Sequence, residues 1–319
     1  MLQKNHQSEI RKNYLLNKYV IITPGRALRP RDIKEQTIIK RSKDCYFCSE
    51  NVSKQQKESK NYLIDEIKEK GKWQVASVRN IFPAVSPNNS QAYGYQEVII
   101  ETRHHSKELG ILDEKQIINV LKMYIKRTKA IQKDQKIDYI LCFKNQGSKA
   151  GASIAHAHSQ IFATSILPPE IQEELYQAQL YKAAKNSCFY CDIIKKEIKS
   201  KRKIYEDAYV AAFTPYASEY HYEAWIFTKR HVDNITKLNN KELLSFAKIL
   251  KTILLKLREL DLSFNYFLHQ VVSNNDQHFY LKIQPRGSVW AGVELGSGLV
   301  INSVSPEIAA QFYRKKLIS

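Results

Sequence analysis

The chain has 319 residues, with 50 Lys or Arg against 32 Asp or Glu, so its formal net charge is +18. This length can bury a sizeable core in one or two globular domains. No apolar run is long enough to cross a membrane and the first residues lack an apolar signal segment, so we expect a soluble cytoplasmic protein with no membrane partner. The lysines are spread along the chain and no nucleic-acid-binding module appears. We therefore expect small anionic substrates and no nucleic acid.

The first half of the chain predicts short strands around one amphipathic helix. Runs rich in β-branched and aromatic residues indicate strands at residues 19–23, 73–83, 97–107 and 139–143. The third run ends in His104 and His105. Residues 113–133 predict a helix, with Asp113 as its N-cap and apolar residues along one stripe. The polar, lysine-rich residues 50–71 predict a surface excursion.

The second half repeats the order of the first. Residues 164–187 are polar and begin near Pro168, which favours a connection between the halves, so we expect domains at residues 1–165 and 166–319. In each half a Cys-x-x-Cys pair precedes a strand that ends in histidine, an amphipathic helix, another strand and a His-x-(His/Tyr) pair. This repetition predicts an internal duplication and an α+β fold. Ser305 and Pro306 open a terminal helix.

One segment combines the residue types needed for phosphoryl chemistry. His156 and His158 are two residues apart, which on a strand places both side chains on one face, and Gln160 is one step further. Small residues ahead of them form a loop whose backbone N–H groups could cradle phosphate: Gly147, Ser148, Gly151 and Ser153. The segment offers an imidazole nucleophile and an amide donor. An isolated His-x-His is more often a metal pair or a buried core pair.

The segment from Asn145 to Gln160, with its Gly-Ala-Ser and His-Ala-His-Ser-Gln motifs, resembles the active site of the galactose-1-phosphate uridylyltransferase branch of the histidine-triad superfamily. That branch also holds ADP-glucose phosphorylase. The resemblance implies two tandem histidine-triad-like halves, each an antiparallel sheet with packed helices. It implies that His158 attacks the α-phosphorus and carries the nucleotidyl group, with its ring oriented by the carbonyl of His156. Gln160 would steady the charge on the phosphate.

The resemblance covers nearly the whole chain and implies further substrate contacts. The nucleotide and phosphate contacts are Arg26, Arg29, Asn80, Asn145, Gly151 and Ser153. Arginine forks suit this role because they match phosphate oxygens in pairs. Asn80 is equally well explained as an ordinary turn residue. Glu294, in a Gly-x-Glu motif, would contact sugar hydroxyls, although a glycine-rich turn between strands is the alternative.

Four of the five cysteines form two Cys-x-x-Cys pairs, which in a reducing compartment indicate metal binding rather than disulfides. Histidines follow each pair in matching order, and Cys2His2 is the composition of closed structural zinc sites. His105 is preferred to His104 because Ser-Lys follows it, as in relatives, and the resemblance makes His156 a ligand. The two predicted zinc sets are Cys45, Cys48, His105 and His156, and Cys188, Cys191, His231 and His278.

The expected activity is uridylyl transfer between UDP-glucose and a hexose 1-phosphate such as galactose 1-phosphate. The alternative is ADP-glucose phosphorylase, which hands AMP to phosphate. The second half carries Tyr280 where the first carries His158, and a phenol is a poor phosphorus nucleophile, so the second half should be catalytically silent. A non-catalytic zinc scaffold, a nucleic-acid-binding protein and a nucleotide hydrolase are weaker alternatives, the first two because His158 and Gln160 are intact. Relatives often dimerise, which leaves a homodimer open.

Overall fold

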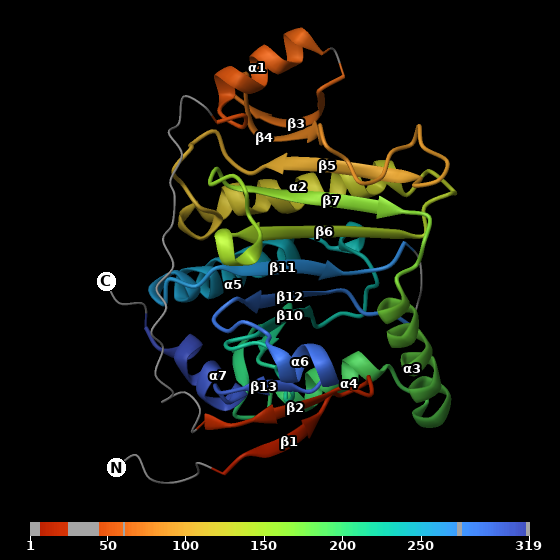
Figure 1. Ribbon diagram of the computed structural model, residues 1–319, viewed down its shortest axis with the longest axis vertical. Coiled ribbons are helices and arrows are strands. Elements are labelled where there is room, and N and C mark those ends of the chain that lie inside the picture. The colour runs from red at the N-terminus through yellow and green to blue at the C-terminus, as the bar shows by residue number, and fades with distance from the viewer. Residues whose placement is uncertain (1–6, 25–44, 60, 273–275, 317–319) are drawn as a thin grey trace.

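The computed structural model describes residues 7–24, 45–59, 61–272 and 276–316. Within them, ten strands form one antiparallel sheet and three strands form a small second sheet (Figure 1). In spatial order the large sheet contains β3 (Leu63–Glu69), β4 (Lys72–Arg79), β5 (Gly94–Ile100), β7 (His158–Thr164), β6 (Tyr139–Gln146), β11 (Phe264–His269), β12 (Tyr280–Pro285), β10 (Ala224–Thr228), β9 (Val210–Phe213) and β8 (Lys203–Glu206).

The small sheet brings the two ends of the described chain together. It contains β1 (Glu9–Lys12), β2 (Tyr19–Ile22) and β13 (Val300–Asn302), with β13 parallel to β2. The helices of the described residues are α1 (Ser49–Glu58), α2 (Glu114–Ile131), α3 (Pro169–Lys185), α4 (Phe189–Glu197), α5 (Asn240–Glu259), α6 (Gly292–Ser297) and α7 (Pro306–Arg314). Among them, none combines the length and the apolar character that a membrane span requires.

The two halves of the chain share the large sheet. Its first five strands come from the first half and its last five from the second, and β6 pairs with β11 at the boundary. This pairing satisfies backbone groups that would otherwise form two exposed sheet edges. The α+β class with antiparallel sheets is confirmed. The predicted boundary after residue 165 falls between β7 and α3, and the two domains stay a prediction.

The main core lies between the sheet and two helices, α2 and α5, which run behind the central strands (Figure 1). The predicted N-cap of α2 is confirmed, because the Asp113 side chain accepts a hydrogen bond of 2.7 Å from the backbone N of Gln116. Asn239 and Glu242 form a capping box at the start of α5. Both helices bury most of the apolar stripe that the sequence predicts, with Leu244 of α5 exposed.

Two local predictions are wrong, and one alternative is excluded. Residues 50–71 lie mostly at the surface, but they are not an irregular excursion, because they contain most of α1 and the edge strand β3, which gains its backbone partners from β4. His156 lies before β7 rather than within a strand, so strand periodicity does not position its ring. The glycine-rich residues near Glu294 form the short helix α6 rather than a turn between strands.

Gly147 has a backbone conformation that other residues rarely adopt, and it lies close to a residue of the second half. Its φ is +81°, and a Cβ atom there would lie 2.2 Å from Oγ of Ser263 in the second half. Gly71 has a φ of +75° but open space around it. We predict that Gly71→Ala lowers the free energy of unfolding by about 1–2 kcal/mol through strain alone. Gly147→Ala should cost more, because strain and a clash act together.

Urea denaturation of the two glycine variants measures the difference. Equal losses would show that the contact between Gly147 and Ser263 relaxes without cost.

Candidate active site and metal clusters

His158 is the first residue of β7, between β5 and β6, and its side chain is mostly buried. Its Nδ1 lies 2.8 Å from the backbone O of His156. A carbonyl can only accept, so Nδ1 carries the proton and Nε2 keeps its lone pair. Burial, with a smaller contribution from the charge of Lys144, lowers the pKa of His158 to about 4. The ring is therefore neutral near pH 7, with Nε2 as the free base.

Gln160 follows on the same face of β7. Its Oε1 accepts a hydrogen bond of 3.2 Å from Nε2 of Gln96 on β5. The amide orientation is thereby set, and Nε2 is the donor end of Gln160. This donor lies two residues beyond His158 on the same strand.

The small-residue loop lies between β6 and His156. Gly147 and Gly151 both have positive φ, and a short 3-10 turn (η4, Ser148–Ala150) lies between them. Asn145, near the end of β6 just before the loop, accepts a hydrogen bond through Oδ1 from Nδ2 of Asn265 at 2.8 Å. Ser153 follows the loop without regular secondary structure. The sequence motif is thus brought to the end of the sheet where β7 begins.

The other predicted contact residues are placed differently. Arg26 and Arg29 lie outside the described residues. Asn80 accepts the backbone N–H of Phe82 at 2.9 Å, so it does make the turn that was the alternative to ligand binding. Glu294 accepts the backbone N–H of Ala291 at 2.9 Å at the start of α6.

Beneath His158 lies a buried ion pair that sequence analysis missed. Lys144 on β6 donates to Oε2 of Glu101 at 2.7 Å and to the backbone O of His158 at 2.9 Å. The two side chains are 1% and 0% exposed. The only available signal was strand alternation, which puts Lys144 in line with the inward-facing Ile140 and Cys142. Lys144 thus fixes the main chain that carries the candidate nucleophile.

The first predicted metal set is gathered in one place. The ligand atoms of Cys45, Cys48, His105 and His156 all lie within 4.8 Å of one another. Nδ1 of His156 lies 3.6 and 3.8 Å from the two sulfurs, and Nδ1 of His105 lies 3.5 Å from Sγ of Cys48. Tetrahedral zinc with normal bond lengths separates S and N ligands by about 3.6 Å. The donor set therefore fits a metal ion of that kind.

The second set repeats this geometry. Cys188, Cys191, His231 and His278 also lie within 4.8 Å of one another. In each cluster the last histidine donates Nε2–H to a threonine carbonyl: His156 to Thr102 at 2.7 Å, and His278 to Thr228 at 2.8 Å. Each Nδ1 is then deprotonated and faces the cysteines, the tautomer that a metal requires. Both clusters could hold a metal ion.

Tyr280, the counterpart of His158, is built into the core. It is 1% exposed, and its ring stacks on Phe227 at 4.5 Å and on His269 at 4.4 Å between centroids. Burial raises the pKa of its phenol well above the ordinary value. A buried, protonated phenol is not available to a substrate, which agrees with a silent second half.

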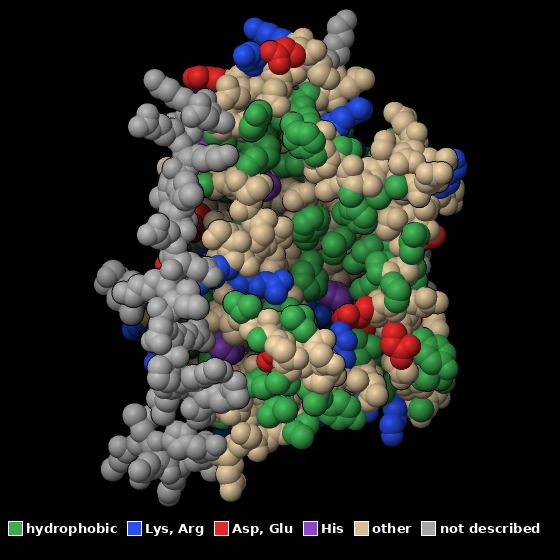
Figure 2. Space-filling view, in the orientation of Figure 1, with side chains coloured by type: hydrophobic (Ala, Val, Ile, Leu, Met, Phe, Trp, Pro, Cys, Tyr) green, Lys and Arg blue, Asp and Glu red, His purple; other side chains and the backbone are tan. Residues whose placement is uncertain are grey.

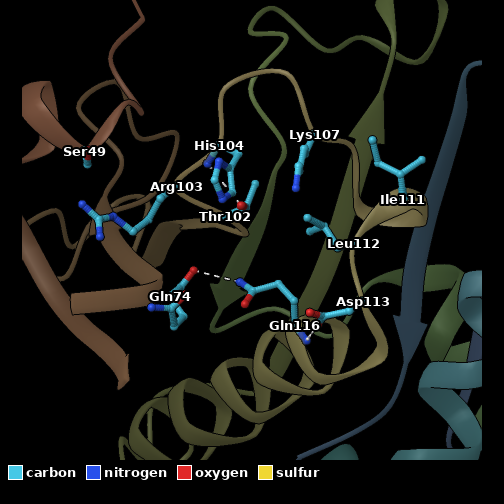
Figure 3. Close-up of a pocket in the computed structure, with 10 residues that line it drawn as sticks. All are labelled: Ser49, Gln74, Thr102, Arg103, His104, Lys107, Ile111, Leu112, Asp113 and Gln116. Carbon is cyan, nitrogen blue, oxygen red and sulfur yellow. Dashed lines mark hydrogen bonds between the residues drawn. The ribbon is translucent and has the colours of Figure 1, made fainter. Parts of the chain in front are cut away.

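A separate cavity of about 580 Å³ lies beside the loop that carries His105 (Figure 3). Arg103, His104 and Lys107 line it, and Gln116 of α2 donates to the backbone O of Gln74 at one side (2.8 Å). No residue from Asn145 to Gln160 lines this cavity. It is therefore distinct from the His158 site.

The α+β fold has a large antiparallel sheet and two Cys2His2 clusters. It also holds the imidazole of His158 in one direction within a His-x-His-x-Gln segment. These features define a protein of the histidine-triad type. The family model described as the N-terminal domain of galactose-1-phosphate uridyl transferase matches residues 1–168. The chain belongs to the galactose-1-phosphate uridylyltransferase family.

Relatives within this family differ in activity. The chain is 30% identical to an ADP-glucose phosphorylase of Arabidopsis thaliana, over 98% of this chain and 94% of the relative. It is 31% identical to a galactose-1-phosphate uridylyltransferase of Thermotoga maritima, over 70% and 75% of the two chains. Among solved structures, an Arabidopsis ADP-glucose phosphorylase with bound ADP-glucose superposes with a TM-score of 0.85, at 29% identity, over 98% and 100% of the two chains.

The buried ion pair yields a prediction. Lys144→Met leaves Glu101 buried without its partner, so we expect a loss of about 3–5 kcal/mol in the free energy of unfolding. Adding Glu101→Leu should recover most of that stability. Nucleotidyl transfer should stay low in both variants, because the carbonyl of His158 has lost its donor. Chemical denaturation and activity assays measure the two effects.

Lys256 provides the matched control. It is equally buried, on α5, and pairs with Glu259 at 2.8 Å. Lys256→Met should reduce stability without a specific loss of activity. Full activity in the Lys144→Met, Glu101→Leu double variant would contradict a positioning role for Lys144.

Proposed function

We propose that the chain is a nucleotidyltransferase that carries the nucleotidyl group covalently on Nε2 of His158. The observation that supports this most directly is the 2.8 Å hydrogen bond from Nδ1 of His158 to the carbonyl of His156. This hydrogen bond directs the basic nitrogen, Nε2, away from the main chain, so that a phosphorus atom could approach it. Burial keeps the ring neutral and nucleophilic.

The reaction has two displacements. In the first, Nε2 of His158 forms a bond to the α-phosphorus of a nucleotide sugar, the bond to the bridging oxygen breaks, and the sugar 1-phosphate leaves as an anion. In the second, another phosphate oxygen attacks the same phosphorus and the neutral imidazole is released. Nε2 of Gln160 donates to a non-bridging oxygen as charge shifts onto it.

The remaining contacts are assigned by the same proposal. Asn145, Gly151 and Ser153 bind phosphate oxygens from the loop, with Arg26 and Arg29 on the diphosphate. Asn80 faces the nucleoside, and Glu294 binds the sugar. Lys and Arg side chains lie at several places on the face shown in Figure 2. The proposed substrates are small anions, a nucleotide sugar and a phosphate or sugar phosphate, and no nucleic acid.

For the donor and acceptor we propose ADP-glucose and phosphate. The sequence favoured uridylyl transfer first, but similarity to ADP-glucose phosphorylase spans nearly the full length of both chains. Uridylyl transfer from UDP-glucose to galactose 1-phosphate is the second candidate, supported by the Thermotoga maritima relative. A homodimer stays a prediction.

We propose that both Cys2His2 clusters hold structural zinc. When bound, zinc supplies no chemistry to the substrate but cross-links the segments that carry its four ligands. His156 is one of those ligands, and its carbonyl orients His158. The first cluster therefore aligns the nucleophile through the main chain.

Label transfer tests the function. After incubation with α-³²P-labelled ADP-glucose or UDP-glucose, the protein should carry acid-labile, base-stable label that is absent from His158→Ala. Label from ADP-glucose that is discharged by phosphate supports the phosphorylase. Label from UDP-glucose that is discharged by galactose 1-phosphate supports the uridylyltransferase. No label from either donor would refute the covalent mechanism.

Metal content tests the zinc assignment. Protein purified without chelators should contain two zinc ions per chain by elemental analysis. Cys188→Ser with Cys191→Ser should reduce this to one while the His158 label persists, because the residue whose carbonyl orients His158 belongs to the first cluster and not to the second. Cys45→Ser with Cys48→Ser should also leave one zinc but abolish the label. Equal effects of the two pairs on labelling would contradict the alignment of His158 by the first cluster.

A further inference from the structure

The phosphate loop of the first half is held by residues of the second half. Nδ2 of Asn265, on β11, donates to Oδ1 of Asn145 at one end of the loop and to the backbone O of Ala150 near the other, both at 2.8 Å. Asn265 and Asn145 are opposite each other in the β6–β11 pairing. One side chain from the second half thus spans the loop.

Arg286 determines which way the Asn265 amide faces. Its Nε donates to Oδ1 of Asn265. Arginine has only donors, so the atom that faces it must be the amide oxygen. The amide nitrogen of Asn265 is then forced towards Asn145 and Ala150, where both of its hydrogens are used. The guanidinium is itself held over the ring of Tyr220, 4.7 Å from its centroid.

The same reasoning fixes the amide of Asn145. Its oxygen accepts from Asn265, so its nitrogen is the end of the amide that can donate elsewhere. A Cβ atom built on Gly151 would lie 4.0 Å from this nitrogen, which places the donor over the loop. A phosphate oxygen only accepts hydrogen bonds. Without Asn265 the Asn145 amide could rotate and present its oxygen to the anion, which would repel it.

We infer that Arg286 and Asn265 are positioning residues that set Asn145 as a hydrogen-bond donor to the nucleotide phosphates. This inference rests on the proposed function, because it takes the loop as the phosphate site. The second half, which lacks a nucleophile, then contributes to substrate binding through two hydrogen bonds in series, from Arg286 to Asn265 and from Asn265 to Asn145.

A double-mutant cycle tests this series of hydrogen bonds without requiring catalysis. Binding of ADP-glucose, UDP-glucose and pyrophosphate is measured by calorimetry on His158→Ala protein, with Asn145→Ala and Asn265→Ala alone and together. We expect Asn265→Ala to weaken binding about tenfold or more when Asn145 is present, as for a lost hydrogen bond to a charged group. In the Asn145→Ala background the further loss should be less than twofold.

Arg286 supplies a conservative pair of variants. Lysine also has donors only, so Arg286→Lys should preserve the amide orientation, whereas Arg286→Met should weaken binding as Asn265→Ala does. Asn239→Ala, which removes the cap of α5 away from this loop, is the stability control and should lower the melting temperature without changing binding. If Asn265→Ala does not fold, the comparison of Arg286→Lys with Arg286→Met tests the same inference.

The outcomes separate the inference from the function. Two results would overturn the positioning role of Arg286 and Asn265, even if wild-type protein forms the labelled intermediate. One is an equal loss of binding affinity for Asn265→Ala with and without Asn145, and the other is equal binding by Arg286→Lys and Arg286→Met. If the losses of binding affinity are coupled but wild-type protein takes up no label, the result would support the positioning of Asn145 for anion binding and would refute the covalent function. No binding of any of the three probes would overturn both.

Discussion

The antiparallel pairing of β6 with β11 is the constraint on which the rest of the structure depends. It turns two sets of five strands into one sheet, so that neither set leaves an unpaired edge at the junction. It also places residues of the second half directly against the loop that precedes His156. The core behind the sheet is continuous for the same reason, because α2 and α5 cover the strands on both sides of the junction.

The candidate nucleophile is held through its main chain. Lys144 binds the carbonyl of His158, and the carbonyl of His156 binds its ring. His156 is in turn held by the first Cys2His2 cluster and by Thr102. Chemistry at an imidazole requires a defined tautomer and direction, and contacts from several segments provide both. The second half repeats the cluster but directs Tyr280 into the core, where the side chain is 1% exposed.

Many of the elements follow from local sequence. The apolar stripe and Asp113 predict α2, and the pattern around Leu243–Leu257 predicts α5, because amphipathic helices and their caps depend on residues a few positions apart. The prediction failed for residues 50–71, where few apolar residues mark an edge strand whose stability comes from β4. It failed for His156, whose position depends on a cluster built from distant segments.

The sequence by itself determined the fold class, the family and the two Cys2His2 sets that could hold a metal, because Cys-x-x-Cys pairs and a His-x-His-x-Gln segment are short-range patterns of specific chemistry. Only the tertiary structure decided how the halves meet and which amide or imidazole atom faces the site. Asn265 and Asn145 are 120 residues apart, and Glu101 reaches Lys144 only across the sheet. Such contacts depend on strand order and register, which local periodicity does not encode.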